Sequence, residues 1–123
     1  MSASGALIAE SLTKDKPLDG VDLRVHKVSR RDVGDVGAGQ PLTWTFIEFE
    51  VDDEVADALA EALSRSIDPS GGWYCDFRTD KETFVVFGGR VFRYPRGDAE
   101  GRDEVESYGR SVGVPPVQLD WPE

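Results

Sequence analysis

The stretch Trp73–Tyr94 constrains the fold more than any other part of this chain. It holds more than half of the aromatic residues, and two of its apolar runs are joined by Gly88 and Gly89. Both central residues of a type I′ turn have positive φ, which glycine adopts without strain because it lacks a Cβ atom. The pattern predicts a β-hairpin with a two-residue turn, in which Phe87 faces Arg90.

Both faces of the predicted hairpin are mostly apolar, because cross-strand partners share a face. One face carries Val85, Phe87, Phe92 and Tyr94, and the other carries Phe84, Val86, Val91 and Arg93. Such strands are typical of the middle of a sheet rather than of a face half in water. Just before the hairpin, Trp73, Cys75 and Phe77 alternate with polar residues. This alternation predicts a third strand and a three-stranded meander.

The remaining chain predicts three more strands and two helices. Strands are expected at 6–12, 21–28 and 42–51, the second of them with one buried face and one polar face. A first helix opens at Asp52 or Asp53 as N-cap and ends before Pro69. A second helix is expected over 99–112.

The order βββαβββα indicates an α+β fold: a mainly antiparallel sheet of about five to six strands, with two helices on one side. The length favours a single globular domain over residues 1–123. Within it, residues 29–41 form a flexible Gly-rich loop. The C-terminal tail, residues 114–123, is expected to pack on the domain through Leu119 and Trp121.

The composition excludes several classes of protein. One cysteine, Cys75, permits no internal disulfide, and with His26 as the one histidine a four-ligand Cys/His zinc site cannot be assembled. We therefore expect no metal and no cofactor. A net charge of −10 disfavours direct binding to nucleic acid or to an anionic membrane. No apolar run is long enough to cross a membrane, so a cytoplasmic protein is expected.

Catalytic motifs are mostly absent, which favours a non-catalytic protein over an enzyme. Cys75 lies on an apolar strand face, where we expect an inert buried thiol rather than the nucleophile of a Cys75–His26 dyad. The glycines of the 29–41 loop do not match a phosphate-binding spacing.

Four polar residues near the aromatic meander are candidates for ligand binding. They are His26, Tyr74, Asp76 and Arg93. A carboxylate beside an arginine on a sheet face is able to hold a ligand. The favoured interpretation is structural: an Asp76–Arg93 or Asp76–Arg78 ion pair that closes the edge of the core.

The leading hypothesis is a small acidic, non-catalytic protein-binding or regulatory module, such as an inhibitor, an immunity-type protein or an adaptor. Its partner would be a protein with a basic surface. One of the aromatic residues Trp44, Tyr74 and Trp121 would serve as an exposed interface anchor. Asp53, Asp57 and Glu61 would form a row of carboxylates along the first helix.

Two further hypotheses remain open from the sequence. The first is a small-molecule-binding protein or small enzyme, with an aromatic-lined pocket around Tyr74, Asp76 and Arg93. A closed cavity lined by these residues and His26 would favour it, whereas a flat acidic surface would favour the protein-binding module. The second is a homodimer formed through an uncovered sheet face.

Overall fold

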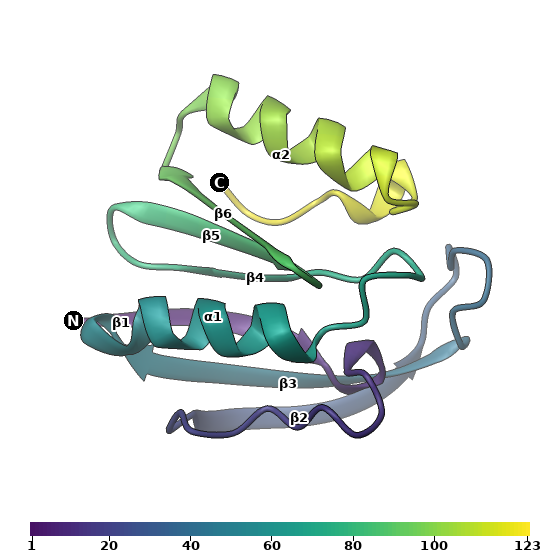
Figure 1. The fold of residues 1–123 in the computed structure, drawn as a ribbon, viewed down its shortest axis with the longest axis horizontal. Coiled ribbons are helices and arrows are strands. Elements are labelled where there is room, and N and C mark those ends of the chain that lie inside the picture. The colour runs from purple at the N-terminus through teal and green to yellow at the C-terminus, as the bar shows by residue number, and fades with distance from the viewer.

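A computed structural model covering residues 1–123 contains a six-stranded antiparallel sheet and two α-helices. The predicted α+β class and the order βββαβββα are confirmed. Figure 1 shows the sheet from β2 at the bottom to β6 near the top, in the order β2-β3-β1-β4-β5-β6. The elements are β1 (Ser2–Ile8), β2 (Arg24–Asp32), β3 (Thr43–Asp52), α1 (Ala56–Ser66), β4 (Cys75–Arg78), β5 (Glu82–Phe87), β6 (Arg90–Pro95) and α2 (Ala99–Ser111).

The β5–β6 hairpin has the predicted register. Phe87 pairs with Arg90, and Val85 pairs with Phe92. Val85 and Val86 point to opposite faces, and both are fully buried. The hairpin is therefore covered on both sides, as its two apolar faces require.

The turn of this hairpin differs from the expected type I′ turn. Gly89 has a φ of 81°, but Gly88 does not adopt positive φ. Gly88 is needed for another reason: a Cβ atom there would lie 2.4 Å from the carbonyl oxygen of Ile67. The end of α1 packs so closely against the turn that no side chain fits at this position.

The two helices cover opposite faces of the sheet, so the expectation that both lie on one side is wrong. α1 packs against a core that includes Phe84 and Val86, whereas α2 packs against the face that carries Val85 and Phe87. The physical reason lies in the hairpin itself. A sheet segment that is apolar on both faces buries both only if an element lies on each side.

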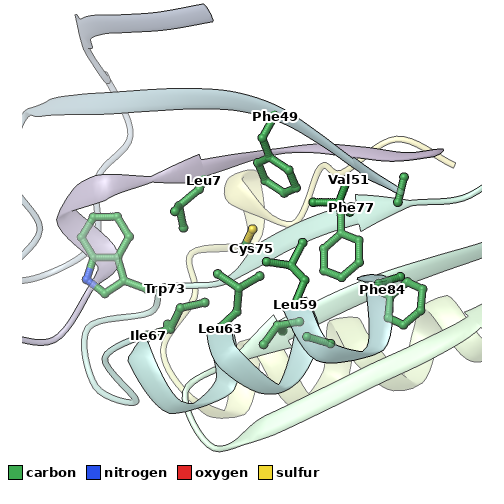
Figure 2. Close-up of a cluster of buried hydrophobic side chains, with 14 of the residues drawn as sticks. Leu7, Phe49, Val51, Leu59, Leu63, Ile67, Trp73, Cys75, Phe77 and Phe84 are labelled. Carbon is green, nitrogen blue, oxygen red and sulfur yellow. The ribbon is translucent and has the colours of Figure 1, made fainter. Parts of the chain in front are cut away.

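The larger core lies between α1 and the central strands (Figure 2). Leu59 and Leu63 project from α1 toward Phe49 of β3 and Phe77 of β4. The side chains of both leucines are completely buried. Burial of this kind contributes roughly 1.5–3 kcal/mol per large apolar side chain. Cys75 lies in the same core, where it is 1% exposed, which confirms the expected buried thiol.

The N-terminal strands differ from their predicted positions. β1 begins at Ser2, earlier than expected, and β2 continues to Asp32 into the predicted loop. β2 has no buried face: Ser29 is half-buried and every other residue of the strand is exposed. β2 is an edge strand, and its side chains are exposed on both faces. Its many charged side chains are typical of edge strands that resist pairing with other chains.

Asp52 directly precedes the helical segment, as predicted, but the expected side-chain cap is absent. β3 extends through Asp52, and a single 3₁₀ turn, Asp53–Val55, leads into α1. Neither Asp52 nor Val55 makes a side-chain capping hydrogen bond. The tight turn brings the chain from the end of β3 directly over the sheet face.

Each glycine of the hairpin turn makes a separate contribution to stability that can be measured. Gly88→Ala should lower the free energy of unfolding by about 1–3 kcal/mol, because it forces a Cβ atom against backbone. Gly89→Ala should lower the free energy of unfolding by about 1–2 kcal/mol, because alanine is strained at the positive φ of this position. Urea unfolding gives both values. Gly34→Ala is the control, since open space surrounds Gly34; equal midpoints for all three variants would contradict this account.

Candidate functional site

The face of the sheet opposite α1 is only half covered. α2 and the C-terminal tail pack on its β5–β6 side, where they bury Val85 and Phe92. On β1 and β3 the same face stays accessible, with Ala6 and Phe46 half-buried and Glu48 exposed. Two adjoining hollows of about 510 and 560 Å³ lie there. We call them together the groove; they share the residues Ala6, Arg31, Phe46, Asp76 and Asp120.

The floor of the groove is apolar and is built by neighbouring strands. Ala6 of β1 pairs with Asp76 of β4, and β1 also pairs with β3, which supplies Phe46. The guanidinium of Arg31, on β2, lies 4.0 Å from the centroid of the Phe46 ring. This cation–π contact fixes one arginine of the exposed edge strand above the floor.

One wall of the groove is the C-terminal tail, which is held by hydrogen bonds as well as by buried side chains. The Tyr74 hydroxyl donates to the backbone carbonyl of Gln118. Trp121 is buried and its Nε1 donates to the hydroxyl of Tyr94 at 2.7 Å. Asp120 lies between these two anchors and remains exposed. The tail therefore presents the Asp120 carboxylate at the groove from a fixed backbone.

Asp76 is the most constrained charged residue of the groove. Its Oδ2 accepts a hydrogen bond from Nη2 of Arg78, which is the second of the two ion pairs considered from the sequence. The side chains of Asp76 and Arg78 are only 20% and 17% exposed. Burial raises the pKa of Asp76, the Arg78 guanidinium opposes this rise, and the Asp120 carboxylate adds to it. Nε of Arg78 is buried without a hydrogen-bond partner.

The four sequence candidates for ligand binding do not all meet. Tyr74 and Asp76 line the first hollow, and His26 lines the second together with Asp76. The His26 side chain is 60% exposed, with Nε2 3.5 Å from Oε1 of Glu50. Arg93 lies elsewhere: it is bound to Glu82 and to Asp57 of α1, on the opposite face. The pocket expected around Tyr74, Asp76 and Arg93 therefore lacks its arginine.

The residues considered for partner binding are mostly engaged within the fold. Trp44 is not an exposed anchor: it is 5% exposed, and its Nε1 donates to the carbonyl of Pro41 at 2.8 Å. Asp53 is half-buried, and Asp57 pairs with Arg93 at 2.6 Å. Glu61 is exposed and makes no ion pair. α1 thus offers no continuous row of free carboxylates.

The chain's thiol, that of Cys75, is buried on the α1 side, and burial raises its pKa well above the ordinary value. No three histidine, cysteine, aspartate or glutamate side chains lie close enough together to hold a metal ion. Neither helix is long and apolar enough to cross a membrane.

The sequence does not predict that Arg31, Phe46 and Asp120 lie together in the groove. Arg31 falls in the segment predicted as a loop, and Phe46 reads as one member of an alternating strand. Asp120 adjoins Trp121 in the tail, so the expected packing of the tail was the available signal for it. No local pattern connects these residues, because they come from β2, β3 and the C-terminus.

No protein-family model, curated protein or solved structure was found to match this chain. Its function is therefore argued from the groove and its residues.

The pKa of Asp76 provides a direct test of the buried ion pair. In the folded protein it should exceed the ordinary aspartate value of about 3.9, because burial disfavours the carboxylate. The folded state then binds the proton more tightly than the unfolded chain does. Protonation of Asp76 therefore adds to stability as pH falls through the folded pKa. Side-chain carboxyl ¹³C NMR measures the midpoint.

Arg78→Gln is the matched variant for this titration. It removes the cation that holds the pKa down, so the Asp76 midpoint should rise further. An unchanged or lower midpoint in Arg78→Gln would show that the two side chains are not paired in solution.

Proposed function

We propose that the protein is a non-catalytic binding module that accepts a basic segment of another protein in the groove. The observation that carries this proposal is the character of the groove itself: acidic side chains surround an open, apolar floor. Its carboxylates outnumber its arginines, with Asp32, Asp35, Glu48, Asp76 and Asp120 against Arg31 and Arg78. Charge complementarity of this kind steers cationic ligands and fixes their register.

The form of the groove supports a macromolecular ligand. The two hollows adjoin over shared residues and run across β1 and β3, between β2 and the C-terminal tail. Two adjoining open hollows suit a segment of polypeptide better than a small molecule, most of which would be enclosed. The aromatic side chains Phe46, Trp73 and Tyr74 supply apolar surface along its length.

The location of the groove also supports this proposal over the acidic helix. α1 carries carboxylates, but Asp57 is already neutralised by Arg93. In the groove, Asp35 and Asp120 are exposed and make no ion pair, and the exposed Glu48 lies 3.9 Å from Nζ of Lys27. Unpaired carboxylates beside apolar surface provide both attraction and burial for a partner's basic side chains.

Peptide titration followed by ¹⁵N NMR tests the proposal. Acetylated, amidated tetra-lysine and tetra-arginine should shift amide resonances of β1 and β3 at the groove, whereas tetra-glutamate should not. Shifts confined to the exposed face of α1, or spread evenly over the surface, would contradict the proposal. So would the absence of binding by both basic peptides.

A pair of double variants separates the groove from the general charge of the protein. Asp35→Asn with Asp120→Asn removes two groove carboxylates and should weaken both basic peptides roughly tenfold, which corresponds to about 1.4 kcal/mol. Glu54→Gln with Glu61→Gln removes the same charge from exposed positions near and on α1. Equal weakening by both double variants would indicate nonspecific attraction and would reject the groove.

A further inference from the structure

We propose that the groove is selective for arginine, whose guanidinium group binds the carboxylates of Asp76 and Asp120 where the two hollows meet. This inference rests on the proposed function, since it names the side chain by which a basic segment is recognised. It adds a single defined position to a groove that would otherwise attract any cation.

The junction of the hollows combines the groups that a guanidinium requires. Asp76 comes from β4 and Asp120 from the tail, so carboxylates from separate elements are brought to the same place. Asp120 lies near enough to contribute to the raised pKa of Asp76. Ala6 and Phe46 also line both hollows, and the Arg31 guanidinium already lies over the Phe46 ring. A flat cation can pack on such a ring while its edge donates hydrogen bonds.

Both carboxylates retain capacity to accept hydrogen bonds. Arg78 binds only Oδ2 of Asp76, and no other residue's side chain donates to that carboxylate. An ionised carboxylate offers about four lone-pair positions, and the one side-chain donor to Asp76 uses only the Oδ2 atom. Asp120 makes no ion pair and is exposed. A ligand therefore does not need to displace Arg78.

The two arginines at the groove differ in their pairing. Arg78 is directed to Asp76 with its Nε buried, whereas Arg31 is held over the uncharged Phe46 ring at 4.0 Å and keeps its positive charge. Asp120 makes no ion pair. The carboxylate left without a partner at the junction is the one that a ligand would neutralise.

Guanidinium fits this junction better than ammonium for geometric reasons. The protein already places guanidinium groups on two groove-lining rings: Arg31 on Phe46, and Arg102 on Trp121 at 4.6 Å. A guanidinium presents several N–H groups in one plane and can donate to two carboxylates at once. An ammonium is compact and strongly hydrated, so it loses more water on an apolar floor.

The test compares three peptides that differ in one side chain. They are Ac-Gly-Gly-Xaa-Gly-Gly-NH₂ with arginine, lysine or citrulline, the last being the uncharged analogue of arginine. Dissociation constants come from ¹⁵N NMR titration of the full chain at low salt. We expect arginine to bind about tenfold more tightly than lysine, and citrulline to bind more weakly than both.

Two single variants locate the selectivity. Asp120→Asn should reduce the arginine-to-lysine affinity ratio to near one, because it removes a junction carboxylate. Asp35→Asn, which lines the groove away from the junction, should weaken both peptides while leaving the ratio unchanged. Both positions are exposed, so the amide spectrum of each variant should match that of the wild type outside the groove.

The outcomes distinguish this inference from the proposed function. Equal binding of arginine and lysine in the groove would overturn arginine selectivity and leave basic-segment binding intact. Loss of selectivity in Asp35→Asn but not in Asp120→Asn would also overturn it. Binding of none of these peptides, nor of the tetrapeptides, would reject both proposals.

Discussion

The pairing of β1 with both β3 and β4 is the interaction on which the rest of the structure depends. β1 joins the β2–β3 half of the sheet to the β4–β6 half, and without it the two halves share no strand contact. Gly5 of β1 faces Phe77 of β4, and a Cβ atom at Gly5 would lie 2.2 Å from the carbonyl oxygen of Asp76. β1 and β4 therefore lie so close together that only glycine fits at position 5.

The central position of β1 leaves half of one sheet face uncovered. α1 lies over the central strands and fills one face, with Leu59 and Leu63 against residues of β3 and β4. α2 follows β6 directly and so covers the far end of the opposite face. The tail returns only as far as the start of β4, where Tyr74, the residue before the strand, donates a hydrogen bond to Gln118. β1 and β3 remain accessible on that face, and the groove lies where the covering layer ends.

Local patterns predicted those parts of the fold whose partners are close in sequence. The register of β5 with β6 follows from one short turn and two apolar runs. β1 was placed several residues late because its pairing with β3 and β4 is set by contacts distant in sequence. β2 was expected to have a buried face, but its position at the sheet edge depends on the topology of the whole chain.

The candidate site was predictable to the extent that its residues stand out locally. Tyr74 and Asp76 were recognised as polar groups within an aromatic strand, and the Asp76–Arg78 pair was one of the two alternatives considered. Arg93 is predicted at the same site, although the predicted hairpin register places it on the face opposite Val85. Asp120 and Phe46 enter the groove only through tertiary packing, which no spacing in the sequence expresses.

The central claim is that an accessible, acidic groove lies over β1 and β3. Paramagnetic broadening by soluble nitroxides measures both properties at once. A cationic nitroxide should broaden the Ala6 methyl and Phe46 ring resonances more than an anionic nitroxide does, and by a larger ratio than at Ala58, which is exposed on α1. Equal ratios at the groove and at Ala58, or no broadening of Ala6 and Phe46, would contradict the account.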